Sequence, residues 1–251
     1  MPAGPFKVNP NDGTTYQRPG GKIASPQAWL FPMSLNTHKV LMFLELSPVG
    51  KKTKINWIDI SGVQGGNYRP DFARLNPIMT VPVLEIDDKV ITDSIYICEY
   101  LRKNYPGPGD KEVDASDKSR EMTYFINQVN DWDEVMYTYG NRSSSAESDL
   151  TNEMRLLRLR QGYAEVAALP DETVPTGGTL KDAYLHKMAG ITYFASIVGD
   201  SEAMRAKKAD KMKKAKADLR DMFLSAEALL NKHSPNGGCL MGSKPTSADA
   251  M

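Results

Sequence analysis

Strand-like and helix-like segments alternate through the first half of the chain. Four segments have the short apolar or alternating pattern of strands: 28–31, 54–60, 81–86 and 89–92. Three segments have helical spacing or strong helix-start signals: 34–46, 70–76 and the stretch after Asp93 and Ser94. Asn36 or Thr37 can cap the first of these helices. The predicted order is therefore β-α-β-α-β-β-α.

The second half of the chain predicts helices alone. Gly, Pro and charged residues dominate 105–117, as in a linker between domains. Helical patterns follow over 118–138, over 150–169 and from 180 to about 232, with an interruption at Gly199–Asp200. We therefore expect four parts: a flexible arm over residues 1–26, an α/β domain over 27–106, a linker over 107–117 and a helical domain over 118–251.

A lysine-rich run at 207–216 lies within the last helical pattern. Apolar residues recur at helical spacing through the same region: Met212, Ala215, Leu219, Met222, Phe223 and Ala226. Lys+Arg and Asp+Glu both number 31, so the formal net charge is zero. We expect the lysines to form the solvated face of an amphipathic helix rather than a nucleic-acid or membrane site.

Cysteine usage and hydropathy narrow the class of protein further. Only Cys98 and Cys239 occur, far apart in the sequence, which favours a reducing, cytoplasmic setting over a disulfide framework. No Cys/His cluster has zinc spacing, so we expect no metal. No apolar window reaches the length of a membrane span, and we expect none in this chain.

Polar residues at three turns are candidates for chemistry. If the Val81–Pro82 bond is cis, the Val81 backbone can pair with an extended peptide; a trans proline would only start a strand. Asp93 and Ser94 can bind a carboxylate or amino-acid group at a helix N-terminus, or can simply cap the helix. The polar residues after the first strand, Ser34, Asn36 and Thr37, can donate to a thiolate or can cap the helix, and these residues alone favour capping.

Three segments resemble the thioredoxin-like domain of glutathione transferases: SLNTHKVLMFLEL, DFARLNPIMTVPVLEIDDKVITDS and ICEYLRKNYP. The resemblance implies a thioredoxin-like α/β domain followed by an all-α domain with an extended helical hairpin. It implies glutathione as co-substrate, with the Val81–Pro82 backbone holding its cysteinyl part. It also implies that Asp93 and Ser94 hold the γ-glutamate. In this family the activating residue follows the first strand, which falls on Ser34.

The same resemblance implies a set of site residues. Ser34 ranks first and Asn36 second as residues that contact the sulfur and carry catalysis. The implied glutathione-binding set is Ser34, Asn36, Thr37, Thr80, Val81, Pro82, Asp93 and Ser94. Met79 and Thr80 stand where the family usually has Gly then Lys or Gln, which weakens one contact to the glycine carboxylate.

The C-terminal half resembles the family less strongly. CLMGSKPTSADAM is similar to the segment in which Thr246 and Asp249 form a structural N-capping box. A capping box predicts a helix after it, and the chain ends at Met251, so we expect the helical domain to be truncated. The segments 182–187 and 136–140 resemble tetrachlorohydroquinone dehalogenases and ganglioside-induced differentiation-associated proteins. Asn36 stands where those dehalogenases use a Cys, which argues against reductive dehalogenation.

Two functions follow from these expectations. The first is a detoxifying glutathione transferase, an enzyme that binds glutathione and transfers its thiolate to a small hydrophobic electrophile, as a homodimer without nucleic acid. The electrophile would lie against the helix over 118–138. The second is a non-catalytic binding or interaction protein with the transferase fold, related to the ganglioside-induced differentiation-associated group. The intact polar set after the first strand favours the enzyme.

Overall fold

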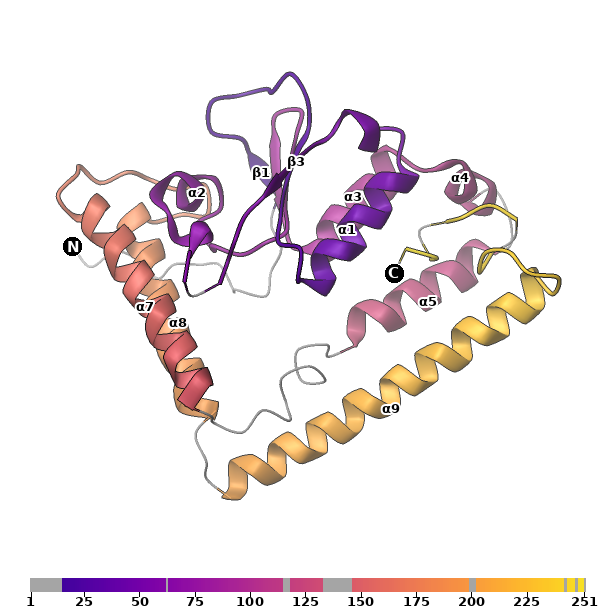
Figure 1. Ribbon diagram of the computed structural model, residues 1–251. Coiled ribbons are helices and arrows are strands. Elements are labelled where there is room, and N and C mark those ends of the chain that lie inside the picture. Colours follow the sequence, from indigo (N-terminus) through magenta and orange to yellow (C-terminus); the bar gives the residue numbers. More distant parts are fainter. Residues whose placement is uncertain are drawn as a thin grey trace. The chain divides into compact units, whose positions relative to one another are not determined.

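A mixed β-sheet is the centre of the first half of the chain in the computed structural model (Figure 1). The structure describes residues 15–61, 63–114, 118–132, 146–198, 202–241, 243–246 and 248–250. The strands are β1 (Thr15–Gln17), β2 (Gln27–Leu30), β3 (Lys54–Trp57), β4 (Val83–Ile86) and β5 (Lys89–Thr92), in the order β1-β5-β4-β2-β3. Only the β2–β3 pairing is parallel. The sheet is therefore antiparallel from β2 outward to β1.

Helices connect these strands in the order that the sequence predicts. They are α1 (Leu35–Leu46), η1 (Gly50–Lys52), η2 (Gly66–Tyr68), α2 (Pro70–Leu75) and α3 (Ser94–Asn104). From β2 to α3 the elements follow the predicted β-α-β-α-β-β-α order, which is thus confirmed. The structure corrects one detail, because α1 begins at Leu35 and Ser34 precedes it. Asn36 and Thr37 therefore lie inside the first turn rather than at its cap.

The segment predicted as an arm contributes a strand to the sheet at residues 15–17. Strand β1 pairs with β5, with Tyr16 opposite Val90. The chain after β1 stays hydrogen-bonded to the β4–β5 turn, where the Arg18 N–H donates to the Asp88 carbonyl at 2.6 Å. The Tyr16 hydroxyl donates to the Leu75 carbonyl. Burial raises the pKa of this phenol, and the Glu85 charge raises it further. Hydrogen bonding to the backbone N–H and C=O groups of the β5 edge thus orders this segment despite its Gly and Pro content.

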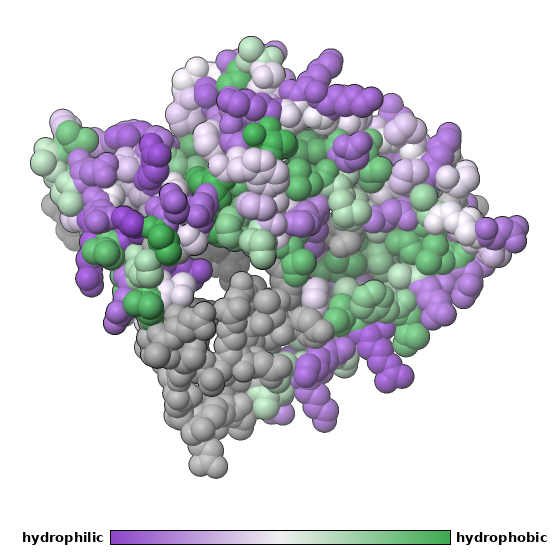
Figure 2. Space-filling model, in the orientation of Figure 1, coloured by the Kyte–Doolittle hydropathy of each residue, from purple (hydrophilic) through white to green (hydrophobic). Residues whose placement is uncertain are grey.

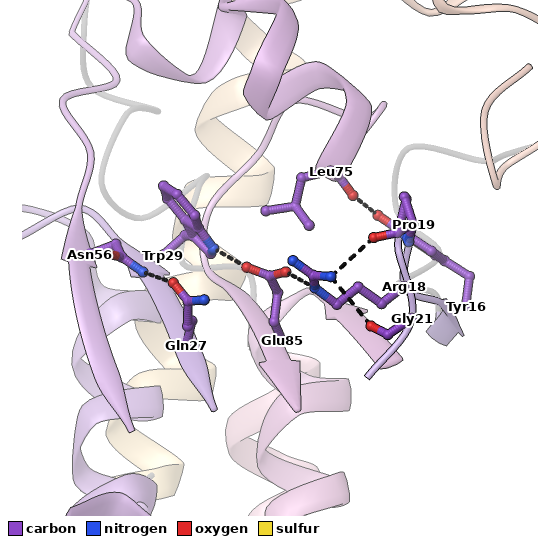
Figure 3. A network of polar contacts seen from close by, with 9 residues as sticks. All are labelled: Tyr16, Arg18, Pro19, Gly21, Gln27, Trp29, Asn56, Leu75 and Glu85. Carbon is purple, nitrogen blue, oxygen red and sulfur yellow. Dashed lines mark hydrogen bonds and ion pairs between the residues drawn. The ribbon is translucent and has the colours of Figure 1, made fainter. Parts of the chain in front are cut away.

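A buried carboxylate links the added strand to the centre of the sheet (Figure 3). Glu85 on β4 is 2% exposed. One of its oxygens accepts the Arg18 Nε–H at 2.6 Å, and the other accepts the Trp29 indole N–H at 2.7 Å. A buried carboxylate without donors would be strongly destabilising, so Arg18 and Trp29 are what make Glu85 tolerable there.

Five further helices follow in the described part of the chain: α4 (Pro108–Asp114), α5 (Ser119–Asp131), α7 (Ala146–Ala167), α8 (Leu180–Val198) and α9 (Glu202–His233). Helix α4 occupies the segment predicted as linker, so that segment is not free of secondary structure. The helix predicted over 118–138 is present as α5, and its predicted last residues lie outside the described part. Among the described residues, no helix combines the length and apolar character needed to cross a membrane.

The chain divides into two units, each considered by itself. One comprises Met1–His38, Lys52–Ile97 and Ser144–Gly199, and the other comprises Lys39–Lys51, Cys98–Ser143 and Asp200–Met251. The sheet and the α7–α8 hairpin thus belong to one unit, while α5 and α9 belong to the other. The division cuts α1 and α3, and the domain boundaries expected around 107–117 stay a prediction.

In the first unit, α7 and α8 lie side by side and pack against η2 and α2 (Figure 1). The Tyr184 hydroxyl of α8 donates to the Tyr68 carbonyl of η2 at 2.7 Å. Gly162 of α7 lies at this contact, and a Cβ there would stand 2.6 Å from both oxygen atoms of that bond. The exposed Arg158 Nε–H donates to the Val63 carbonyl at 2.9 Å. The absence of a side chain at Gly162 therefore allows the hairpin to pack closely.

In the second unit, α9 runs beside α5 and has the predicted amphipathic character. Along the visible side of α9, purple hydrophilic residues lie next to green hydrophobic ones (Figure 2). The described lysines of the run are exposed: Lys211, Lys213, Lys214 and Lys216. Ala215 is buried, and its carbonyl accepts the Trp132 indole N–H at 2.8 Å. The expected solvated face is thus confirmed, although Phe223 is 69% exposed rather than packed.

The predicted capping box is present in the same unit. The Thr246 N–H donates to an Asp249 oxygen at 2.8 Å, and the Thr246 hydroxyl donates to the same oxygen at 3.0 Å. The other Asp249 oxygen accepts the Leu240 N–H at 2.6 Å. This carboxylate therefore serves structure, as the sequence predicts.

Gly162→Ala tests the close packing of the hairpin. The added methyl group would overlap the Tyr184 hydroxyl and the Tyr68 carbonyl, so we expect a loss of about 1–3 kcal/mol of unfolding free energy. Gly190→Ala on α8 is the matched control, because its Cβ would meet nothing within 4 Å. The control should gain up to about 1 kcal/mol from helix propensity. Urea denaturation measures both, and equal effects would contradict the packing argument.

Arg18→Met tests the role of the added strand. It leaves the buried Glu85 carboxylate with Trp29 as its one remaining side-chain donor among the described residues. We expect a loss of about 1–3 kcal/mol. Arg69→Met removes a fully exposed ion pair with Asp71 and should change stability by less than about 0.5 kcal/mol. Thermal and urea unfolding distinguish the two; an effect of Arg18→Met as small as the control would show that Glu85 does not need Arg18.

Candidate functional site

The first turn of α1 carries three of the predicted site residues. Ser34 directly precedes the helix, and its carbonyl accepts the Thr37 N–H at 3.1 Å and the His38 N–H at 3.2 Å. Among the described residues, the partly buried Ser34 hydroxyl has no hydrogen bond. Thr37 is fully buried, and its hydroxyl accepts the Phe31 N–H at 3.1 Å. Thr37 thus holds the end of β2 against α1, whereas Ser34 is available to a ligand.

The start of α3 carries the acidic-serine pair. Asp93 has a φ of 71°, in the left-handed region that Asp tolerates better than most residues. Its carboxylate accepts the Ile95 N–H at 2.8 Å and its carbonyl accepts the Ile97 N–H at 3.0 Å. Asp93 is therefore the N-cap of α3, and Ser94 is the first residue inside the helix.

A hydrogen bond joins the starts of α1 and α3. The Ser94 hydroxyl donates to the Asn36 amide oxygen at 2.9 Å. Ser94 as a whole residue is 4% exposed. These two residues lie 58 positions apart in the sequence. The bond fixes which way the Asn36 amide points, because its oxygen accepts from Ser94. Of the predicted site residues, Asn36 and Ser94 are thus joined across the fold by a side-chain hydrogen bond.

The loop before β4 is held by two asparagines. Asn76 donates to the Thr80 carbonyl at 2.8 Å and accepts the Ile78 N–H at 3.1 Å. Asn67 of η2 donates to the Met79 carbonyl at 2.7 Å. Met79 is fully buried with a φ of 55°. The sequence pattern singled out neither asparagine for this role.

Val81 and Pro82 follow this loop through a cis peptide bond. Strand β4 begins at Val83, one residue beyond Pro82. Among the described residues, the N–H and C=O of Val81 make no backbone hydrogen bond. The Val81 backbone can therefore pair with an extended peptide in the manner of an added strand.

These residues together suit an anionic group and an extended peptide backbone. Two helix N-termini favour negative charge through their free N–H groups and their dipoles. The chain's own cysteines fit a nucleophile poorly: Cys98 is buried, and burial followed by Asp249 raises the pKa of Cys239. Among the described residues, no group of three or more His, Cys, Asp and Glu side chains could hold a metal.

The sequence of residues 30–109 matches the family of the glutathione S-transferase N-terminal domain. Glutathione S-transferase TCHQD of Arabidopsis thaliana is 21% identical over 63% of this chain and 56% of its own length. Glutathione S-transferase Z1 of the same plant is 37% identical over 28% of this chain and 30% of its own length. Among solved structures, a glutathione transferase homologue of Lodderomyces elongisporus, titled as holding two GSH per subunit, is 15% identical. That alignment covers 91% of this chain and 80% of the other, with a TM-score of 0.45.

Residues 30–109 therefore form a domain of the glutathione S-transferase N-terminal family. The fold class of the chain is a thioredoxin-like domain with an all-helical C-terminal domain. The matched segments span about half or less of the curated relatives named above. The ligand roles of Ser34, Asn36, Val81 and the other predicted site residues stay predictions.

A double-mutant cycle tests the bond between the two helix starts. Asn36→Ala and Ser94→Ala each remove one partner of the same 2.9 Å bond. We expect a coupling energy of about 0.5–1.5 kcal/mol in urea unfolding. Asn127→Ala on the exposed face of α5 should combine additively with Ser94→Ala. A coupling of zero for the first pair would mean that the bond contributes nothing to the folded state.

Proposed function

We propose that this protein binds glutathione and transfers its thiolate to a small hydrophobic electrophile. The extended backbone of the tripeptide pairs with Val81, and its γ-glutamyl carboxylate lies at the start of α3 beside Asp93 and Ser94. Helix N–H groups suit that carboxylate. Asp93 suits the amino group of the same γ-glutamyl residue through its charge.

Ser34 carries the chemical step in this proposal. Its hydroxyl donates a hydrogen bond to the sulfur and so favours thiolate over thiol. The thiol proton passes to solvent, the thiolate attacks the electrophilic carbon, and a carbon–sulfur bond forms as the leaving group departs with its electron pair. Addition to an activated double bond needs no leaving group and instead takes up a proton. Asn36 orients the site through its bond with Ser94.

One observation carries the proposal: the 2.9 Å bond between Asn36 and Ser94, within the segment that matches the family. It joins the helix start beside the proposed sulfur site to the helix start proposed for the γ-glutamate. Capping alone accounts for each helix start separately, but capping does not require a bond between them. The unpaired Val81 backbone supports the same orientation of the peptide.

Ser34→Ala tests the catalytic part. Calorimetry of the unaltered chain should show saturable glutathione binding, and Ser34→Ala should keep most of it. The same variant should raise the pKa of the bound thiol by about one unit, seen in the thiolate ultraviolet absorbance, and lower conjugation about tenfold. Asn127→Ala, exposed on α5, is the control and should change neither. Absence of saturable binding, or unchanged conjugation in both Ser34→Ala and Asn36→Ala, would exclude this function.

A non-catalytic transferase-fold protein is the second candidate. The buried Met79, with its left-handed backbone, stands where the family usually has glycine, and this departure favours altered glutathione recognition. This candidate predicts weak glutathione binding, no conjugation and a partner on the α7–α8 hairpin. Deletion of the hairpin would then abolish partner binding, whereas the first candidate ties activity to Ser34.

A further inference from the structure

Two cations occupy the packed faces of the α7–α8 hairpin, where apolar residues belong. On α7 the buried face has helical spacing through Leu159, Gly162 and Val166, and Arg155 continues it one turn earlier. On α8 the corresponding face runs through Leu180 and the Ala183–Tyr184 pair to Lys187. Both cationic side chains are partly buried rather than exposed. Their positions therefore need a physical explanation.

Neither cation has a carboxylate partner among the described residues. The Arg155 Nε is buried and has no hydrogen bond there. Neighbouring cations of the same hairpin and of α2 are paired: Lys181 with Asp171 at 2.9 Å, and Arg74 with Glu172 at 2.8 Å. The Arg158 side chain donates to the Val63 carbonyl. Among the partly buried cations of the described hairpin, Arg155 and Lys187 are thus the two without a partner.

The pKa of Lys187 reflects both its burial and a neighbouring positive charge. Burial, followed by the charge of Arg155, lowers the pKa of Lys187 to about 8. Arg155 also affects the phenol of Tyr68. Burial raises the pKa of that phenol, and the Arg155 charge and a hydrogen bond with Asn67 partly offset the rise. Arg155 on α7 and Lys187 on α8 continue the two helix faces that pack with Tyr68 in one hydrophobic cluster. No acidic group contributes to the Lys187 shift.

Partly buried like charges without a counter-ion oppose folding, and a bound anion removes that opposition. Lys187 could lie on the packed face if its side chain extended so that the ammonium reached solvent. That explanation does not apply to Arg155, whose buried Nε has no hydrogen bond. We propose that Arg155 and Lys187 form an oxyanion-binding site that takes a carboxylate or phosphate group. Guanidinium and ammonium donors bind both groups through charge-assisted hydrogen bonds.

The site adjoins the loop that precedes Val81. Helix α7 contacts η2, which contains Asn67 and Tyr68, and Asn67 donates to the Met79 carbonyl two residues before Val81. The oxyanion can therefore come from glutathione itself, through its glycine carboxylate, or from a separate acid or phosphate. The phosphate source does not depend on the proposed transferase function.

Lys187→Met and Arg155→Met test the site on the full chain with inorganic phosphate as the probe. Thermal unfolding is measured with and without phosphate at constant ionic strength. Phosphate should raise the melting temperature of the unaltered chain, as binding to the folded state alone requires. Each variant should weaken phosphate binding about tenfold or more. Arg160→Met, on the exposed face of α7, is the matched control and should keep the full phosphate effect.

A second measurement separates the site from a merely structural role. Without anion, Lys187→Met should melt at the same temperature as the unaltered chain or higher, because methionine suits the packed face. Competitive labelling of amines should show that phosphate protects Lys187 and that Arg155→Met removes this protection. A lower melting temperature for Lys187→Met together with unprotected labelling would overturn the proposal.

Two glutathione ligands identify the source of the oxyanion. The glycyl ethyl ester of glutathione lacks the glycine charge. If Lys187→Met weakens binding of glutathione but not of the ester, the site binds the glycine carboxylate. If Lys187→Met weakens phosphate binding and leaves the binding of glutathione and of its ester unchanged, the site binds a separate anion. Either of these two results supports the site. If phosphate and glutathione act equally on Lys187→Met and Arg160→Met, the site does not exist. Failure of the ester comparison alone leaves glutathione transfer by Ser34 intact.

Discussion

Strand β4 is buried along its whole length, and the arrangement of the first unit depends on that burial. A buried strand needs partners for its backbone N–H and C=O groups, and β4 has β2 on one side and β5 on the other. Glu85, in its middle, needs donors of its own and receives them from Trp29 and Arg18. The residues on either side of this β4–β5 hairpin, Val81 and Asp93, are those proposed to hold glutathione.

The site separates into parts that local sequence can specify and parts that it cannot. Asp93 caps α3 as predicted, because capping involves only neighbouring N–H groups. The Thr37 hydroxyl, by contrast, accepts the Phe31 N–H inside the fold. That contact depends on the path of the chain between β2 and α1. The bond between Asn36 and Ser94 likewise joins residues far apart in sequence, so no local pattern reveals it.

The α7–α8 hairpin shows the same contrast. Its helices and the break between them follow from apolar spacing and from the Pro and Gly residues over 170–179. The reciprocal bonds between Thr179 and Asp182 at the start of α8 are also local. Its docking on η2, by contrast, rests on Gly162 and on the bond from Tyr184 to Tyr68. The same docking leaves Arg155 and Lys187 together on the packed side, where charge in a helical pattern would ordinarily indicate solvent.

The sequence by itself determined the order of elements, the amphipathic nature of α9, the capping box at Thr246 and Asp249, and the family of the domain over residues 30–109. These follow from periodicity, caps and motif residues, which act over a few positions. The tertiary structure decided that residues 15–17 join the sheet as β1, since edge pairing with β5 depends on a distant strand. It also decided which polar side chains meet: Arg18 with Glu85, and Ser94 with Asn36. Such contacts arise because burial brings together residues that the sequence keeps apart, and each must then satisfy the charge or hydrogen bond of the other.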